Sequence, residues 1–376
     1  SPRFFLDIIL LLILMLFSGC TLFDNSGDSR DGRSVDPRRE LFVIHSLAET
    51  ISSVALNENG SFGPVQSDVQ YLGAVPNHLL RLGDEIVVTL SGQNELLRLD
   101  ENTLRLTARI NQGAGNNPME TVNLHPAGGT TSLADGLLVT THLFSDRLRI
   151  DDTRERSWTS GPPWTSGTGV APQALLALPG SSAEEVRLLV ANTAFSTSNF
   201  GSSPFGNATV TATTFQLSSS GGQGTLQRIS TSSIDLEQIG PGSGTNPTAL
   251  IDAPALDQVL VIGSGDNYES GDTNDGSVTI LLRETLGVES RIEVGDSPGS
   301  GILRSEGIGH RLYMAGPSGI KSIYHDGNQW ESAARQEYDA TSGGGNLPFI
   351  ADIAGFVNTV YAADFANSRI LAFTVG

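Results

Sequence analysis

The sequence predicts an all-β protein, a β-propeller with seven blades of about four antiparallel strands each. Three observations favour this fold. A pair of apolar strands joined by a polar hinge recurs seven times, and a proline precedes most copies by about a dozen residues. No apolar stripe with the helical period of 3.6 residues continues for more than two turns, so helices are at most a minor part. A six-bladed ring is the alternative, because six such prolines are present.

The first nineteen residues have the pattern of a secretory signal. Arg3 precedes an apolar run at residues 8–17, which at about ten residues is too short to span ~30 Å of hydrocarbon as a helix. The sequence LFSGC at residues 16–20 resembles the lipobox of bacterial lipoproteins, and this resemblance implies that Cys20 is lipidated and becomes the mature N-terminus. Thr21 after the cysteine implies outer-membrane sorting, on the periplasmic or the surface face. The alternative is an ordinary signal peptide with a coincidental cysteine.

Residues 20–40 form a polar stretch rich in Gly, Ser and Asp, which is typical of a flexible tether. The expected organisation is therefore a lipoprotein signal peptide at 1–19, a tether at 20–40 and the propeller at 41–376. We expect a monomer that its lipid anchor holds at a membrane of the bacterial envelope.

The spacing of the repeat fits the blades of a propeller. Its copies start at residues 41, 85, 137, 188, 259, 311 and 359. Steps of 44 to 71 residues leave room for four short strands in each copy. A blade packs on both faces against its neighbours, which explains why the strands are continuous apolar runs and do not alternate.

The prolines form a second pattern in phase with the first. They are Pro76, Pro118, Pro172, Pro247, Pro298 and Pro348. Because proline lacks an amide donor, it fits the loop that leads from the outer strand of one blade into the inner strand of the next. The first repeat lacks an obvious innermost strand and the last lacks an outermost one. We therefore expect the ring to close between residues 41–75 and 348–376.

Two copies of the repeat resemble a known family most clearly. The segments VVTLSGQNELLRLD (87–100) and VYAADFANSRILAF (360–373) are similar to the YVTN-type repeats of bacterial seven-bladed propellers. The resemblance covers roughly residues 41–376 and is weaker where long insertions interrupt the fourth and fifth copies. It implies an extracytoplasmic protein that acts as a platform for binding more than as an enzyme.

Three segments are candidates for a binding rim. The hinges of the fourth repeat (192–207) and the fifth (263–276) are enlarged, and the loop before the fourth repeat (155–172) holds two of the three tryptophans. If these segments share one face of blades 3–5, they form an aromatic and acidic patch that suits a protein or glycan ligand. The candidate ligand-binding residues are Trp158, Trp164, Phe195, Phe200, Phe205 and Tyr268. The alternative is that the aromatic side chains fold back and cover the blade ends.

The acidic hinge of the fifth repeat is a candidate calcium loop. Ca²⁺ is bound by six to eight oxygens, which interleaved carboxylates provide. The candidate ligands are Asp266, Glu269, Asp272 and Asp275. Ser270 interrupts the alternation, so an acidic loop without a metal is the alternative, and no other cofactor is expected.

Motifs for catalysis are weak. The stretch Gly-Asp-Ser-Pro-Gly at 295–299 has the spelling of a nucleophile elbow, but that motif needs a strand-to-helix turn, so Ser297 is not expected to be catalytic. The six histidines show no close pairing of the metal-ligand type. His45 and His142 occupy equivalent hinge positions, where we expect a polar role.

Composition narrows the function further. The chain has 376 residues with 41 acidic and 22 basic side chains, and a surface of formal net charge −19 repels nucleic acid. The single cysteine, Cys20, excludes intrachain disulfides and cysteine-rich metal sites. The sequence therefore predicts a lipid-anchored, non-catalytic binding or scaffolding module. Two alternatives are a channel-centred metal-dependent hydrolase or lactonase, and a structural partner in outer-membrane assembly.

Overall fold

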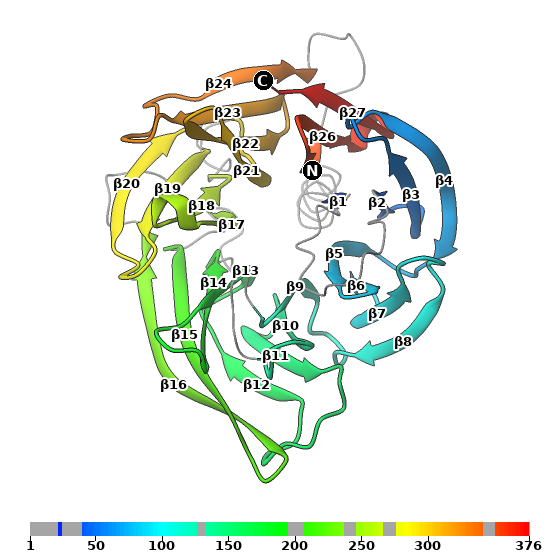
Figure 1. Cartoon of the computed structure of the whole chain (residues 1–376), viewed down its shortest axis with the longest axis vertical. Helices are drawn as coiled ribbons and strands as arrows, with labels where there is room; N and C mark the ends of the chain where they lie inside the picture. The colour runs from blue at the N-terminus through cyan, green and yellow to red at the C-terminus, as the bar shows by residue number, and fades with distance from the viewer. Residues whose placement is uncertain are drawn as a thin grey trace, which may run out of the picture.

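The strands form seven antiparallel sheets arranged in a ring (Figure 1). The computed structural model describes residues 22–24, 40–125, 132–194, 207–236, 246–265, 276–340 and 350–375. Within these ranges, helical turns are short, such as the 3₁₀ turns η3 (Pro254–Leu256) and η5 (Phe365–Asn367). No helix in the described part of the chain is long and apolar enough to cross a membrane. The prediction of a seven-bladed β-propeller is confirmed, and the six-bladed alternative is wrong.

Strands that follow one another in the chain are neighbours in each sheet, and each sheet begins at the centre of the ring. The first two sheets are β1 (Leu22–Asp24), β2 (Glu40–His45), β3 (Thr50–Leu56), β4 (Phe62–Tyr71) and β5 (Pro76–Leu82), β6 (Glu85–Leu90), β7 (Glu95–Asp100), β8 (Leu106–Asn111). The third and fourth are β9 (Pro118–Asn123), β10 (Leu137–His142), β11 (Arg147–Asp152), β12 (Trp164–Gly167) and β13 (Pro172–Pro179), β14 (Glu185–Asn192), β15 (Thr209–Ser220), β16 (Gln223–Asp235). The fifth and sixth are β17 (Pro247–Ala253), β18 (Gln258–Gly263), β19 (Ser277–Leu282), β20 (Val288–Glu293) and β21 (Ser300–Glu306), β22 (Gly309–Gly316), β23 (Gly319–His325), β24 (Arg335–Asp339). The seventh is β25 (Ile350–Phe356), β26 (Thr359–Asp364), β27 (Arg369–Thr374).

The prolines begin the inner strands, as predicted. Four of them are the first residues of inner strands β5, β9, β13 and β17, namely Pro76, Pro118, Pro172 and Pro247. Pro298 comes two residues before β21, and Pro348 lies outside the described residues. A side chain of the preceding blade donates to several of their carbonyl oxygens: Ser46 Oγ to Pro76 O (2.6 Å), Asn77 Nδ2 to Pro118 O (3.3 Å) and Thr248 Oγ1 to Pro298 O (3.1 Å). These positions therefore join consecutive blades near the axis of the ring.

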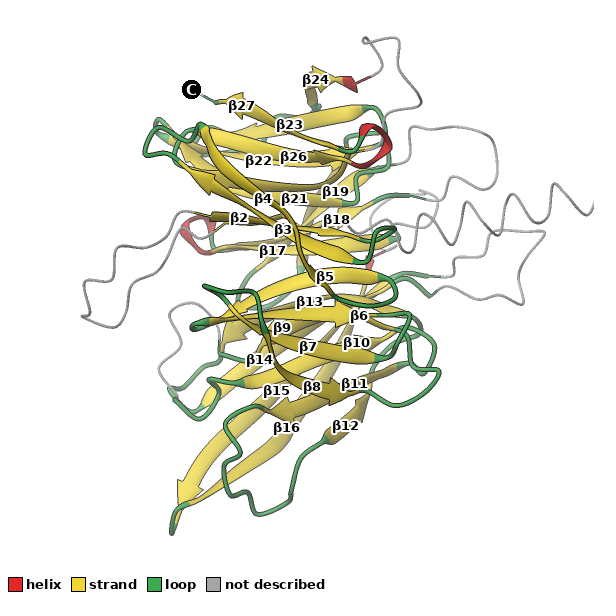
Figure 2. Ribbon diagram, turned by 90° about the vertical axis from the view of Figure 1, so that its right-hand side faces the viewer, coloured by secondary structure: helices red, strands yellow, loops and turns green. Residues whose placement is uncertain are grey.

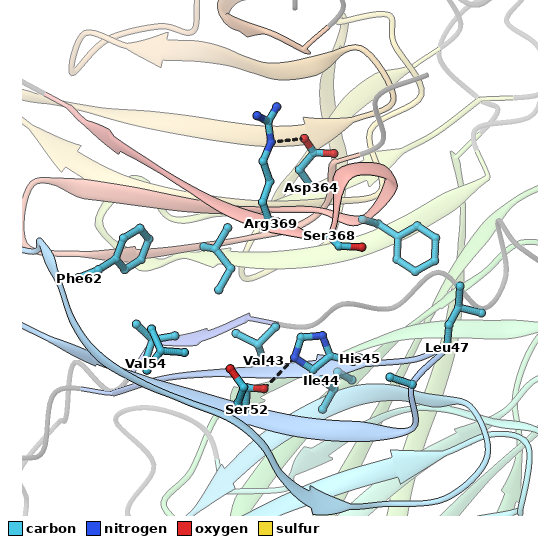
Figure 3. Close-up of a pocket in the computed structure, with 15 residues that line it drawn as sticks. Val43, Ile44, His45, Leu47, Ser52, Val54, Phe62, Asp364, Ser368 and Arg369 are labelled. Carbon is cyan, nitrogen blue, oxygen red and sulfur yellow. Dashed lines mark hydrogen bonds and ion pairs between the residues drawn. The ribbon is translucent and has the colours of Figure 1, made fainter. Parts of the chain in front are cut away.

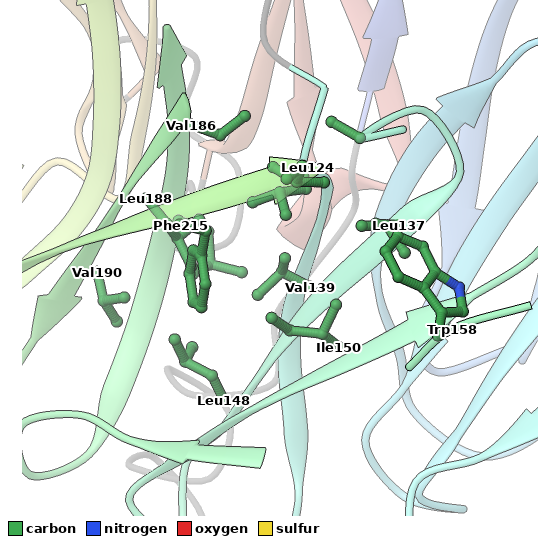
Figure 4. Close-up of a cluster of buried hydrophobic side chains, with 13 residues drawn as sticks. Leu124, Leu137, Val139, Leu148, Ile150, Trp158, Val186, Leu188, Val190 and Phe215 are labelled. Atoms are coloured by element: carbon green, nitrogen blue, oxygen red, sulfur yellow. The ribbon is translucent and has the colours of Figure 1, made fainter. Parts of the chain in front are cut away.

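The hydrophobic core is divided into clusters that lie between neighbouring sheets. In one of them, Leu137 and Val139 of the third sheet pack against Leu188 and Val190 of the fourth (Figure 4). All six residues of β10 are buried, because this strand has a neighbouring sheet on each side. Figure 2 shows the sheets from the side, with the long β15–β16 hairpin extending beyond the others. Burial on both faces explains the continuous apolar runs in the sequence.

The ring closes where the first sheet packs against the last, as expected. β1 supplies the innermost strand that the first repeat lacked, and it comes from within residues 20–40, where a tether was expected. In the described residues the seventh sheet has three strands. Val54 of the first sheet contacts Tyr361 and Ala363 of the seventh in one apolar cluster. The Tyr361 hydroxyl also donates to the Gly60 carbonyl oxygen across this contact.

The substitution Tyr361→Phe tests the closing contact. It removes a hydrogen bond from a fully buried side chain, so we expect the free energy of unfolding to fall by about 1 kcal/mol in a urea titration. Tyr71→Phe is the matched control, because the Tyr71 hydroxyl bonds to Glu49 on the exposed surface and should contribute less than about 0.5 kcal/mol. Equal effects of the two substitutions would contradict the closure described above.

Candidate functional site

Most of the predicted site residues lie outside the described residues. These are Cys20, Phe195, Phe200, Phe205 and Tyr268, together with the acidic residues Asp266, Glu269, Asp272 and Asp275. Glycan binding at the hinges and a calcium loop therefore stay predictions. Within the described ranges, no group of three or more His, Cys, Asp or Glu side chains is arranged to hold a metal ion.

The segment that holds the two tryptophans is not a loop throughout. Residues 155–172 were predicted to be a loop between blades, but they contain the outer strand β12. β12 pairs with β11 so that Trp164 lies opposite Ile150, whereas Gly167 lies opposite Arg147 beside the β10–β11 hinge. Trp164 is therefore at the end of the blade away from that hinge. The enlarged hinges of the fourth and fifth repeats lie outside the described residues, so the shared patch stays a prediction.

Trp158 is part of the core between the third and fourth blades. Its side chain is 8% exposed, and its Nε1 donates to Asp152 Oδ2 (2.7 Å). Its ring stands edge-on to the half-buried Trp164, with 5.1 Å between the ring centroids. It also pairs with Gly224 near the end of the β15–β16 hairpin. This burial fits the alternative, in which aromatic side chains cover the blade ends, and it leaves Trp158 little surface for a ligand.

A groove of about 440 Å³ runs between the first and seventh sheets (Figure 3). One wall comes from β2, β3 and β4, and the other from β26, η5 and β27. Most of the lining is apolar, with Val43, Ile44, Leu47, Ala48, Val54, Phe62, Val65, Phe365 and Ile370. The two walls come from opposite ends of the chain, about 300 residues apart in the sequence.

The groove lies beside the seventh sheet, which has three strands within the described ranges. The other six sheets each have four strands, whereas among the described residues β27 is the outermost strand of the seventh. Beside it, β4 leaves apolar side chains in contact with water: Phe62 is 39% and Val65 58% exposed. Exposed apolar groups that line a hollow are typical of a docking surface.

Four of the polar groups in the groove form two pairs. Arg369 Nε lies 2.9 Å from Asp364 Oδ2 in an ion pair, and His45 Nε2 lies 2.9 Å from Ser52 Oγ. Burial lowers the pKa of His45, although the charge of Asp68 opposes this shift. His45 is therefore neutral at pH 7, and the groove presents apolar walls without an unpaired charge among these groups.

A second candidate lies on the innermost strands. His78 and Glu120 occupy equivalent positions, each two residues after the proline that begins its strand. His78 Nε2 lies 3.6 Å from Glu120 Oε1, and the Leu175 amide donates to Glu120 Oε2 (2.8 Å). The Thr121 amide donates to His78 Nδ1 (3.4 Å), so in the neutral ring Nε2 carries the proton. Sequence reasoning missed both residues, although their shared distance from a proline was a usable signal.

Burial shifts both groups of this pair toward their neutral forms. It lowers the pKa of His78 to about 4 and raises the pKa of Glu120 to about 8, with a smaller contribution from the charge of Asp352 to the latter. At pH 7 both groups are therefore neutral, although their side chains keep 21% and 25% of their surface exposed. The pair supplies neither an activated nucleophile nor, among the described residues, a metal centre.

Two other features named in the sequence analysis, His142 and the Gly-Asp-Ser-Pro-Gly stretch, are part of the scaffold of the propeller. His142 is buried, its Nε2 lies 3.0 Å from Gln112 Oε1, and burial lowers its pKa to about 4. Pro298 of the Gly-Asp-Ser-Pro-Gly stretch leads into strand β21 and not into a helix, which removes the context that a nucleophile elbow requires.

Comparison with known proteins supports the fold. No protein-family model matches the sequence, and no curated protein matches it. The structure is similar to "Kuenenia stuttgartiensis Hydrazine Synthase", with 10% identity, a TM-score of 0.60 and coverage of 93% of this chain and 99% of that chain. It is also similar to a chain of the "Mitotic Checkpoint Complex", with 10% identity, a TM-score of 0.56 and coverage of 96% and 90%. BamB from Moraxella catarrhalis aligns with 13% identity, a TM-score of 0.45 and coverage of 90% and 82%. At 10% identity, the first two comparisons show a shared fold alone.

The pH dependence of stability tests the surroundings of Glu120. The folded state keeps the Glu120 proton up to about pH 8, whereas the unfolded state loses it near pH 4.5, so stability falls as pH rises between these values. His78 opposes this trend only below its unfolded pKa of 6.5. We therefore expect the melting temperature of the wild type to decrease from pH 6.5 to 8, and Glu120→Gln to flatten this decrease. Parallel curves for the two proteins would show that Glu120 has an ordinary pKa.

Proposed function

We propose that this chain is a non-catalytic binding propeller, which holds an extended segment of a partner protein in the groove between its first and seventh sheets. The observation that carries the proposal is the position of the groove. It lies beside the one sheet that has three described strands, and it is lined by the exposed apolar residues Phe62 and Val65. A propeller fold suits this role, because rigid blades hold the walls of such a groove in place.

The chemistry of the lining favours a polypeptide over a sugar. Sugars are bound through many hydrogen bonds, whereas two pairs of polar side chains in this groove, His45–Ser52 and Asp364–Arg369, already bond to each other. Apolar side chains of a partner would replace water against Val54, Val65 and Ile370 at about 25 cal/mol per Å² of buried apolar surface.

The partner belongs to the bacterial envelope if the N-terminal segment acts as its sequence indicates. Cys20 becomes lipidated, and several acyl chains at ~0.8 kcal/mol per buried methylene hold the propeller at a membrane, with the outer membrane as the proposed address. A propeller anchored there presents its groove to other envelope proteins. The role of structural partner in outer-membrane assembly is one form of this function.

Substitution of Cys20 tests the anchor. In a Gram-negative host, the wild type should sediment with the outer membrane, and its N-terminal peptide should carry the mass of the acyl chains. Cys20→Ser removes the thiol that forms the thioether, so the protein should become soluble or stay unprocessed. A wild type whose N-terminal peptide has no added lipid mass would refute the anchor.

Peptide selection tests the groove. We expect 12-residue peptides selected from a phage-displayed random library on the full-length protein to bind in the groove. Val65→Asp places a charge in the apolar lining and should weaken binding at least about tenfold, or ~1.4 kcal/mol. Leu106→Asp is the matched control on outer strand β8, because Leu106 is 41% exposed and lies away from the groove. Peptides that bind both variants as they bind the wild type would contradict the proposal, as would a selection that yields no binders.

A further inference from the structure

We infer that the occupant of the groove pairs its main chain with β27 and completes the seventh sheet as its fourth strand. This inference rests on the proposed function and adds how the partner is held. The other six sheets show what belongs at this position, since each has a fourth antiparallel strand beside its third. Addition of a strand to an open sheet edge is a known mode of peptide recognition, in which main-chain hydrogen bonds supply the affinity.

The hydrogen bonds of β27 identify the groups that are available. The Val375 amide donates to the Asn358 carbonyl oxygen (2.8 Å), and hydrogen-bonded positions alternate along an antiparallel pair. The amides of Leu371 and Phe373 therefore point toward β26. The main-chain groups of Ile370, Ala372 and Thr374 point toward the outer edge, where no strand pairs with β27 among the described residues.

β27 also lacks the features that protect the outer strands of the other sheets. Five of those strands carry a charged residue or a proline away from their first residue, and the sixth, β12, has only four residues. The residues are Pro64 and Asp68 in β4, Arg109 in β8, Arg228 in β16, Arg291 in β20 and Glu337 in β24. The sequence of β27 is RILAFT, and its one charge, Arg369, is at its first residue and pairs with Asp364. A strand edge of this kind favours pairing with another chain.

The two faces of β27 define the side chains that the occupant needs. Ile370 lines the groove, whereas Leu371 and Phe373 pack against the sixth sheet, with 4.9 Å between the ring centroids of Phe373 and Tyr338. Side chains of a fourth strand alternate in the same way. Those on the groove side meet Phe62 and Val65, so the occupant has apolar residues at alternate positions.

Charge favours a partner protein over a second copy of this chain. Two copies of net charge −19 repel each other, whereas a basic segment is attracted. The occupant is therefore an extended, basic strand of another protein, apolar at every second residue.

The probe for this inference is a synthetic peptide with the sequence of residues 104–112, LRLTARINQ. It copies the outer strand β8, it carries two arginines, and its Leu, Ala and Ile alternate with polar residues. The amide exchange rates of β27 are measured residue by residue with and without the peptide. A second sample carries the same sequence on a flexible Gly-Ser linker after residue 376, which raises its effective concentration to about the millimolar range.

We expect the peptide to slow exchange at Ile370, Ala372 and Thr374 by about tenfold or more, and to leave Leu371 and Phe373 unchanged because they already bond to β26. Because the amides of alternate residues point to the same edge of a strand, N-methylation of the set that faces β27 should abolish the effect, whereas N-methylation of the other set should leave it unchanged. If the linked strand also leaves the three amides unchanged, strand pairing is wrong. The contrasting outcome is a peptide from the phage selection that loses affinity for Val65→Asp and yet slows exchange at none of the amides of Ile370, Ala372 and Thr374. In that case the groove binds its partner without strand pairing, and the proposed function survives. A dimer of the free protein with these amides slowed would make a second copy the occupant and overturn the choice of partner.

Discussion

The packing of the first sheet against the last is the interaction on which the ring depends. Each sheet buries both faces only if it has a neighbour on each side, and the two end sheets gain their second neighbour by meeting each other. The contact uses buried side chains, with Val54 and Leu56 against Phe356 and Tyr361. It does not use a strand shared between the two ends, because the described strands of both sheets are local in sequence.

This way of closing the ring determines where a site can form. Near the axis the two sheets are in close contact, and Tyr361 is fully buried. Farther out the blades diverge, and in the other sheets a fourth strand fills the space. The seventh sheet has three described strands, so the space between β4 and β27 is open to water and Val65 is 58% exposed. The same contact therefore stabilises the ring and leaves a groove beside an open strand edge.

Much of the fold could be predicted because propeller blades repeat along the sequence. The sevenfold repeat of hinged strands predicted the number of blades, the prolines marked where inner strands begin, and the atypical first and last repeats predicted the place of closure, but two short strands were missed. Leu22–Asp24 lies in a polar stretch, and Trp164–Gly167 has the sequence WTSG, so neither has the apolar run that reveals a strand. Because β12 was missed, residues 155–172 were expected to be a loop throughout. The groove could not be predicted, because its walls come from opposite ends of the chain and hold no motif.

The exchange rates of the free protein test the central claim most directly, namely that the seventh sheet ends in an open edge. Measured by NMR in the monomeric protein without any ligand, the amides of Leu371 and Phe373 should exchange slowly, since they bond to β26. Those of Ile370, Ala372 and Thr374 should exchange at rates close to those of exposed loops. Slow exchange at all five positions would contradict the account, because it would mean that another part of the chain already covers the edge.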